Sequence, residues 1–148
     1  MDEPITRMST EECWDFLDRH ELGRLAYHLL AEVHIVPINY AVELDHSGRR
    51  TLLFRTAEGS KLIAVVMNSD VAFEADEMDE ESATSVIARG RARVLDEVEE
   101  HRAENVPLRP WVEGLKYNVV EIRPTEISGR HFDLNRPWLH IIPEPDES

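Results

Sequence analysis

The stretch Phe54–Lys61 combines the residue types that bind phosphate. A predicted strand ends with Arg55 and Thr56, a glycine-containing loop follows, and a predicted helix begins at Ser60 and Lys61. Backbone N–H groups and the dipole at a helix start favour a bound anion. Arginine can bind phosphate through two parallel hydrogen bonds, and lysine adds a point charge. The stretch therefore predicts a phosphate site, with Thr56 and Ser60 as neutral donors.

The same two cations have a competing use, because the chain holds 30 acidic residues. Arg55 and Lys61 can instead form surface ion pairs, which contribute little to stability. Glu58 lies in the same loop and weakens an anion site unless its side chain points outward. The residue types alone leave both interpretations open.

The rest of the chain lacks the motifs of self-sufficient catalytic sites. It contains no G-x-S-x-G, G-x-x-x-x-G-K-[ST] or G-x-G-x-x-G pattern. His28 and His34 lie near Glu32, but their spacing is not that of a metal-binding pair, and we predict no metal site. Cys13 is the only cysteine and is interpreted as a core residue. We therefore expect any chemistry to come from a bound cofactor, with no catalytic residue assigned.

Composition narrows the possible partners. The 148 residues are 31% charged and 42% hydrophobic, as expected for one soluble domain. Sixteen Lys and Arg against 30 Asp and Glu give a net charge of −14, so binding to nucleic acid or to anionic membranes is not expected. No apolar stretch is long enough to span a bilayer and no signal-peptide pattern opens the chain, so we expect a cytoplasmic protein.

Local patterns predict the elements that position these residues. Ser9–Glu12 fits a capping box that starts a helix, and Gly23 is expected to stop it, after a loose tail over residues 1–8. Alternating or apolar segments predict strands over 24–29, 34–44, 51–56, 71–75, 84–95, 117–123 and 126–132. Short helices are predicted over 61–67 and 96–105.

Three residues are expected to shape these strands. Pro37 favours an edge or bulged position, Gly90 a bend or bulge, and Pro124 a break before the last strand. Six or seven strands with few helices predict a mainly β fold, a small antiparallel Greek-key barrel. One domain is expected over residues 1–148, with its core at about 9–132 and a C-terminal tail.

The order of these segments resembles the FMN-binding split-barrel superfamily related to pyridoxamine 5′-phosphate oxidase. The similarity is carried by GRLAYHL, VPINYAVE, LLFRTAEGSKL, SDVAFEADEMD, SVIARGRARVLD, PLRPW and VEIRPTEISGR, over about Ser9–Phe132. The match is to a small actinobacterial-type branch that is also similar to nitroimidazole-resistance proteins and deazaflavin-dependent reductases. It implies a six- to seven-stranded antiparallel Greek-key split β-barrel.

The resemblance also implies a homodimer with two flavin pockets between the subunits. It assigns the phosphate and ribityl end of FMN to Arg55, Thr56, Ser60 and Lys61. It assigns the wall along the isoalloxazine ring to Val36, Pro37, Ile38, Asn39 and Tyr40. Phe54 is expected close to the ring, and Trp111 is expected to close the pocket from the partner subunit. For Tyr40 and Trp111, ordinary packing is the alternative.

The resulting hypothesis is a flavin-dependent oxidoreductase acting on a small organic substrate. The alternatives are a non-catalytic protein that binds flavin or haem, a deazaflavin-dependent reductase, and a barrel that has lost its cofactor. FMN is the expected cofactor, with FAD, deazaflavin and haem as alternatives, because Ala83-Thr84 stands where relatives often carry Gly-Trp. Pyridoxamine phosphate oxidation itself is not expected, since no C-terminal segment resembles the one with which the oxidase binds its substrate.

Overall fold

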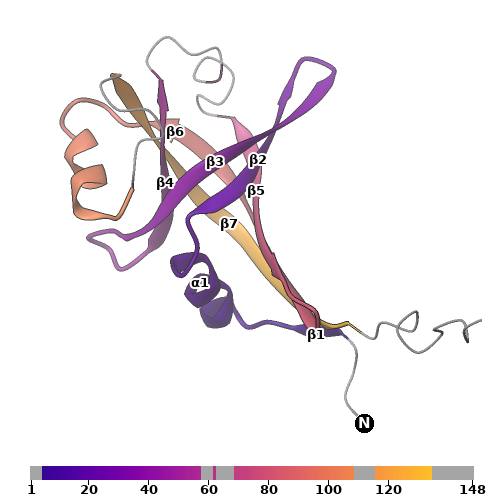
Figure 1. Ribbon diagram of the computed structural model, residues 1–148. Coiled ribbons are helices and arrows are strands. Elements are labelled where there is room, and N and C mark those ends of the chain that lie inside the picture. Colours follow the sequence, from indigo (N-terminus) through magenta and orange to yellow (C-terminus); the bar gives the residue numbers. More distant parts are fainter. Residues whose placement is uncertain (1–4, 58–61, 63–68, 109–115, 135–148) are drawn as a thin grey trace, which may run out of the picture.

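The computed structural model describes residues 5–57, 62, 69–108 and 116–134 (Figure 1). Its seven strands are β1 (Ile5–Arg7), β2 (Leu22–Leu29), β3 (Glu32–Leu44), β4 (Arg50–Ala57), β5 (Asp70–Met78), β6 (Ser82–Val94) and β7 (Tyr117–Asp133). Its helices are α1 (Thr10–Asp18) and the 3-10 helix η1 (Glu100–Asn105). The mainly β class predicted from the sequence is confirmed.

The strands form one antiparallel sheet that closes on itself. Their order is β1-β7-β4-β3-β2-β5-β6, and β6 pairs again with β7. Strands β2 to β7 therefore make a closed barrel, and β1 is added at the edge of β7. Figure 1 shows β6 and β7 continuing beyond the barrel as a long ribbon towards β1. The predicted antiparallel split barrel is confirmed.

Helix α1 begins as predicted but ends earlier. The Ser9 hydroxyl accepts a hydrogen bond from the Glu12 amide, and the Glu12 carboxylate accepts one from the Ser9 amide, which completes the capping box. The prediction that Gly23 stops the helix is wrong, because the helix ends at Asp18 and Gly23 lies in β2. A Cβ atom on Gly23 would lie 2.2 Å from the Phe73 ring, so close packing explains this glycine.

Two further predictions about the strands are wrong. The N-terminal segment is not wholly a loose tail, because Ile5–Arg7 pairs with the β7 residues Arg130–Phe132. Strand β7 also does not break at Pro124, because Gly90 pairs with Pro124 while Arg89 pairs with Glu126. Residue 125 is therefore an extra residue on β7. The proline is accommodated by a β-bulge, opposite the glycine that was expected to make one.

Strand β3 carries Pro37 where its missing N–H costs nothing. Residues Glu32–Asn39 of β3 pair with β2 on one side, whereas the ladder with β4 covers only Tyr40–Leu44. Pro37 therefore needs no donor on the β4 side, as the edge position predicted for it requires.

One helix in the second half of the chain is shorter than predicted. The predicted helix over 96–105 is the 3-10 helix η1 alone. Of the predicted helix over 61–67 the structure describes only Leu62, and most of the C-terminal tail lies outside the described residues. Among the helices that the structure describes, none is long and apolar enough to cross a membrane.

Two apolar clusters stabilise the barrel. The main cluster fills its interior and includes Leu25, Phe54 and Phe73 from the strands and Phe16 from α1, which packs against the barrel. A smaller cluster lies outside β3, β4 and β7, where Ala103 and residues near η1 cover Ala41, Leu53 and Val119. The 3-10 helix η1 thus covers only part of the outer face of these strands.

Candidate functional site

One face of β3 and β4 points into the barrel. The inward-facing side chains assigned to the flavin site are Val36, Ile38, Tyr40 and Phe54, of which the last three are 7%, 1% and 0% exposed. The Tyr40 hydroxyl donates a 2.6 Å hydrogen bond to the Leu17 carbonyl, and its ring packs edge-on against Phe73. Burial raises the pKa of the Tyr40 phenol, which therefore stays protonated at neutral pH. These side chains belong to the core, so only the backbone beside them can face a ligand.

The opposite face of the same strands carries Pro37, Asn39 and Arg55. Successive side chains of a strand point to opposite faces, so Pro37 and Asn39 lie outside the barrel. Tyr40 and Phe54 form the last pair of the β3–β4 ladder, and Asn39 and Arg55 are the next residues of the two strands, just beyond its end. The structure thus places an amide and a guanidinium on the same outer face, where the two strands stop pairing.

Arg55 is a cation without a carboxylate partner. Within the described part of the chain, no ion pair or hydrogen bond involves its guanidinium, despite the net charge of −14. Thr56 faces inward and is 8% exposed, so it does not share the outer face with Arg55. Ser60, Lys61 and Trp111 lie outside the described residues. The competing interpretation of Arg55 as one half of a surface ion pair therefore finds no support in the residues that the structure describes.

Large apolar side chains are exposed beside this pair. Leu22, Val33 and Ile35 are 50%, 81% and 69% exposed, and Pro37 continues their row on β3. Contiguous apolar surface of this kind marks a contact with another protein or with a ligand. We refer to Leu22, Val33, Ile35 and Pro37 as the apolar strip. It ends at Asn39, which pairs with Leu22 across the β2–β3 ladder.

Two carboxylates that the sequence did not single out lie next to the strip. Arg24 pairs with Pro37 on one side and with Glu74 on the other, and its guanidinium binds both Glu74 and Asp76. Burial, and secondly a hydrogen bond with Asp76, raises the pKa of the Glu74 carboxyl. Hydrogen bonds with Glu74 and then with Arg24 lower the pKa of Asp76.

Glu74 of this pair is a candidate proton carrier on the outer face. A carboxyl with a raised pKa exchanges its proton closer to neutral pH than an exposed glutamate does. Ser85 adds a hydrogen bond of 3.1 Å from its hydroxyl to Glu74. The alternation Glu74-Ala75-Asp76 was the available sequence signal, because it puts both acids on one face of a strand.

His28 and His34, the two histidines near Glu32 in the sequence, lie elsewhere. His34 Nε2 is 3.1 Å from a Glu32 carboxylate oxygen, and its ring stacks on Tyr27 with the centroids 5.4 Å apart. His28 and His34 lie near the end of the β2–β3 hairpin, away from Asn39 along β3. Over the ranges that the structure describes, no group of three or more His, Cys, Asp or Glu side chains is placed to hold a metal ion.

The sequence matches a known protein family over most of its length. Residues 9–131 match the sequence profile of pyridoxamine 5′-phosphate oxidase. The chain belongs to the pyridoxamine 5′-phosphate oxidase family. An uncharacterised Mycobacterium tuberculosis protein (strain CDC 1551 / Oshkosh) is 45% identical over 100 residues, covering 67% of this chain and 84% of that protein.

Solved structures of this family's fold are similar over most of the chain. The FAD binding protein from Mycobacterium smegmatis is 43% identical with a TM-score of 0.77, covering 87% of this chain and 99% of the other. The FAD and haem binding protein from Mycobacterium smegmatis is 14% identical with a TM-score of 0.69, covering 88% and 74% of the two chains. The second likeness shows a shared fold alone.

The outer face meets the needs of the flavin that the family implies. A flavin has a flat ring with one polar edge and a chain ending in phosphate. Pro37 and Asn39 supply an apolar contact and an amide, and Arg55 supplies a cation on the same outer face. The ladder between β3 and β4 ends at the Tyr40–Phe54 pair, so the residues of β3 before Tyr40 are paired in the sheet with β2. The residues present therefore fit a flavin.

Proposed function

We propose that this protein binds a flavin, FMN by preference, on the outer face of β3 and β4 and uses it in the oxidation or reduction of a small organic molecule. The observation that carries the proposal is Arg55, an unpaired guanidinium among the described residues of a strongly acidic chain. It lies on the same outer face as Asn39 and the apolar strip. Membership of the pyridoxamine 5′-phosphate oxidase family supports the proposal.

Each residue has a defined task in this proposal. Arg55 binds the cofactor phosphate through charge-assisted hydrogen bonds, together with Ser60 and Lys61 as the sequence predicts. Asn39 and the neighbouring β3 backbone bind the polar edge of the ring, and Pro37 contacts its flat face. The flavin, when bound, supplies the two-electron chemistry, and the protein supplies its orientation and electrostatic surroundings. Glu74, with its raised pKa, is the candidate to hold a proton for the substrate.

Different observations support FMN and FAD as the cofactor. The phosphate site predicted from the sequence at Phe54–Lys61 favours FMN, which carries a terminal phosphate. FAD is the second candidate, because the FAD binding protein from Mycobacterium smegmatis is 43% identical to this chain. Titration with FMN, FAD, a deazaflavin and haem, followed by absorption spectra, distinguishes these cofactors. Bleaching of the bound flavin by NAD(P)H supports an enzyme, whereas a stable flavin or Soret band supports a binding protein.

Replacing Arg55 with glutamine is expected to weaken FMN binding about ten- to a hundredfold, because hydrogen bonds to a charged group are each worth about 1.5–3 kcal/mol. Lys61→Ala is expected to do the same on sequence grounds. Riboflavin lacks the phosphate, so its Kd should hardly respond. Flavin fluorescence titrations measure both constants.

Arg49→Gln is the matched control for this experiment. Arg49 is also an exposed arginine without an ion pair among the described residues, and its side chain lies in the turn before β4. Arg49→Gln removes the same charge as Arg55→Gln, but away from the flavin face. The FMN affinity of this variant should therefore stay within about twofold of the wild type. An Arg55→Gln variant that binds FMN like the wild type would show that the phosphate is held elsewhere.

We further propose that the protein is a homodimer in which the apolar strip is buried. Ile35→Lys puts a charge into this surface and is expected to convert the dimer to a monomer at micromolar concentration, as measured by light scattering. Val98→Lys is the control, because Val98 is 78% exposed and lies before η1, outside the strip. A wild type that is itself monomeric would contradict the proposal and leave the fold unaffected.

A further inference from the structure

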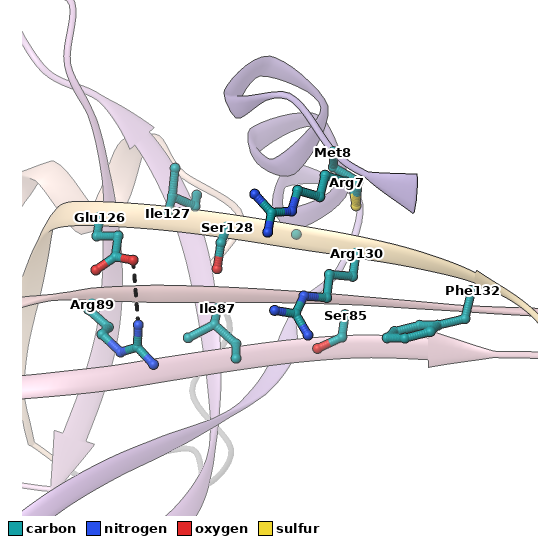
Figure 2. Close-up of a pocket in the computed structure, with 11 residues that line it drawn as sticks. Arg7, Met8, Ser85, Ile87, Arg89, Glu126, Ile127, Ser128, Arg130 and Phe132 are labelled. Atoms are coloured by element: carbon teal, nitrogen blue, oxygen red, sulfur yellow. Dashed lines mark ion pairs between the residues drawn. The ribbon is translucent and has the colours of Figure 1, made fainter. Parts of the chain in front are cut away.

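A cationic pocket lies on the β6–β7 ribbon (Figure 2). It has a volume of about 500 Å³ and includes Arg7, Arg89, Arg130 and a single acidic residue, Glu126, in its lining. Three arginines against one glutamate leave the lining with a net charge of +2. The whole chain carries −14, so this local excess of positive charge runs against the composition of the protein.

Two of these arginines face each other directly. Arg7 of β1 pairs with Arg130 of β7 in the antiparallel register. Like charges directly opposite each other in such a pair destabilise the sheet. Within the residues that the structure describes, neither guanidinium has an ion pair or a hydrogen bond. The third arginine differs, because Arg89 lies 3.5 Å from the Glu126 carboxylate and so neutralises the one acid of the pocket.

The fold holds the two cations in this arrangement. The Met8 amide donates a 2.9 Å hydrogen bond to the Gly129 carbonyl, which fixes the junction of β1 and α1 on β7. A Cβ atom on Gly129 would lie 2.7 Å from Cys13 Sγ and 2.8 Å from Met8 Sδ, so only glycine allows this close approach without a shift. The close packing of Met8 and Cys13 against Gly129 therefore fixes the position of Arg7 on β7.

Neutral groups complete the pocket. Figure 2 shows both guanidinium groups directed towards its middle, where Ser128 and Ile87 lie. Ser85 pairs with Arg130 from the other side, but its hydroxyl donates to Glu74, so Ser128 is the hydroxyl left to donate to a ligand. Ile87 and Phe132 offer apolar contact area.

We propose that this pocket is a second ligand site, which binds an organic phosphate monoester between Arg7 and Arg130. Two guanidinium forks match the charge and the three terminal oxygens of a phosphate dianion, whereas a carboxylate neutralises only one of them. Ile87 and Phe132 contact the organic group of the ester. The pocket lining includes no residue of β3 or β4, the two strands that carry the proposed flavin face, and it meets the Glu74 pair only through the hydroxyl of Ser85.

Binding of phenyl phosphate, benzoate and phenol, measured by calorimetry, tests the proposal. Phenyl phosphate is expected to bind the wild type, benzoate about tenfold more weakly, and phenol not measurably. Arg130→Gln and Arg7→Gln are each expected to weaken phenyl phosphate at least tenfold. Arg49→Gln removes one charge away from the pocket and should change the affinity less than twofold.

Thermal unfolding gives an independent readout. Without ligand, Arg7→Gln is expected to raise the Tm relative to Arg49→Gln, because it removes the like-charge pair. Phenyl phosphate should then raise the Tm of the wild type more than that of Arg130→Gln. Equal affinities in the wild type and Arg130→Gln, or no binding to the wild type at millimolar phenyl phosphate, would overturn the proposal.

FMN titration of Arg130→Gln separates this proposal from the flavin site. The second site requires FMN affinity to stay within twofold of the wild type. A large loss of FMN affinity would overturn it, because the arginine pair would then belong to the flavin pocket of a dimer. Failure of the flavin proposal itself would appear separately, in the titration of Arg55→Gln.

Discussion

Gly90→Ala is expected to destabilise the protein by about 3 kcal/mol or more, at the upper end of the cost of overpacking. A Cβ atom at this position would lie 2.0 Å from the Arg123 carbonyl oxygen and 2.8 Å from the Pro124 Cα atom. Both neighbours are backbone of β7, which cannot move aside without opening the ladder between β6 and β7. Urea unfolding measures the change.

Gly48→Ala is the comparison for this variant. Gly48 has a φ of 86° in the turn between β3 and β4, and no atom lies within 4 Å of an added Cβ. Its cost comes only from the left-handed backbone, about 1 kcal/mol. If the two alanine variants lost equal stability, the tight contact of Gly90 with β7 would not be what makes this glycine necessary.

The second large effect is expected at Glu121, the only charged side chain that is fully buried in the described part of the structure. Its carboxylate binds Arg102 of η1, Arg93 of β6 at 3.3 Å and Arg123 of its own strand at 2.7 Å. Removing this carboxylate leaves Arg123 without its partner and leaves Arg102 and Arg93 with only Glu43 and Glu99. Glu121→Ala is therefore expected to cost about 3 kcal/mol or more.

The same strand offers a matched control. Glu126 pairs with Arg89 at 3.5 Å, and both side chains are more than half exposed. Glu126→Gln should therefore change the free energy of unfolding by about 0.5 kcal/mol or less. Comparison of the two variants by urea unfolding isolates the effect of burial, and equal losses would contradict it.

This network also explains how η1 is held on the barrel. Arg102 binds Glu43 of β3 as well as Glu121 of β7, with its Nε 2.9 Å from Glu43 Oε1. These interactions hold Ala103 over Ala41 and Leu53 on the outer face. The cover leaves the neighbouring part of that face, with Asn39 and Arg55, outside the cluster under η1.

Local sequence patterns predicted most of the elements correctly. The capping box at Ser9, the turn at 45–48 and the strands with alternating side chains depend on neighbours a few residues apart. Gly90 was also recognised as a bulge position, because a glycine inside a strand has few other uses. The candidate cation Arg55 and its strand were predicted by the same kind of local reasoning.

The errors arose where distant segments meet. Nothing near Gly23 in the sequence reveals the Phe73 ring packed against it, and nothing near Ile5–Arg7 reveals the open edge of β7. Alternation put Val36, Ile38 and Tyr40 on one side of a strand, but only packing decided that this side is the core and that Asn39 and Arg55 lie outside.

The sequence by itself determined the fold class through local periodicity, the family through the resemblance of its ordered segments, and the identity of the cations through residue type. Only the tertiary structure decided which cations lack partners. Arg55 and Arg7 look like the other arginines in the sequence, yet the described residues pair neither of them with an acid. Arg7 and Arg130 are adjacent solely because the β1–β7 register joins the two ends of the domain. Electrostatic energy depends on distances in space, which the sequence order does not contain.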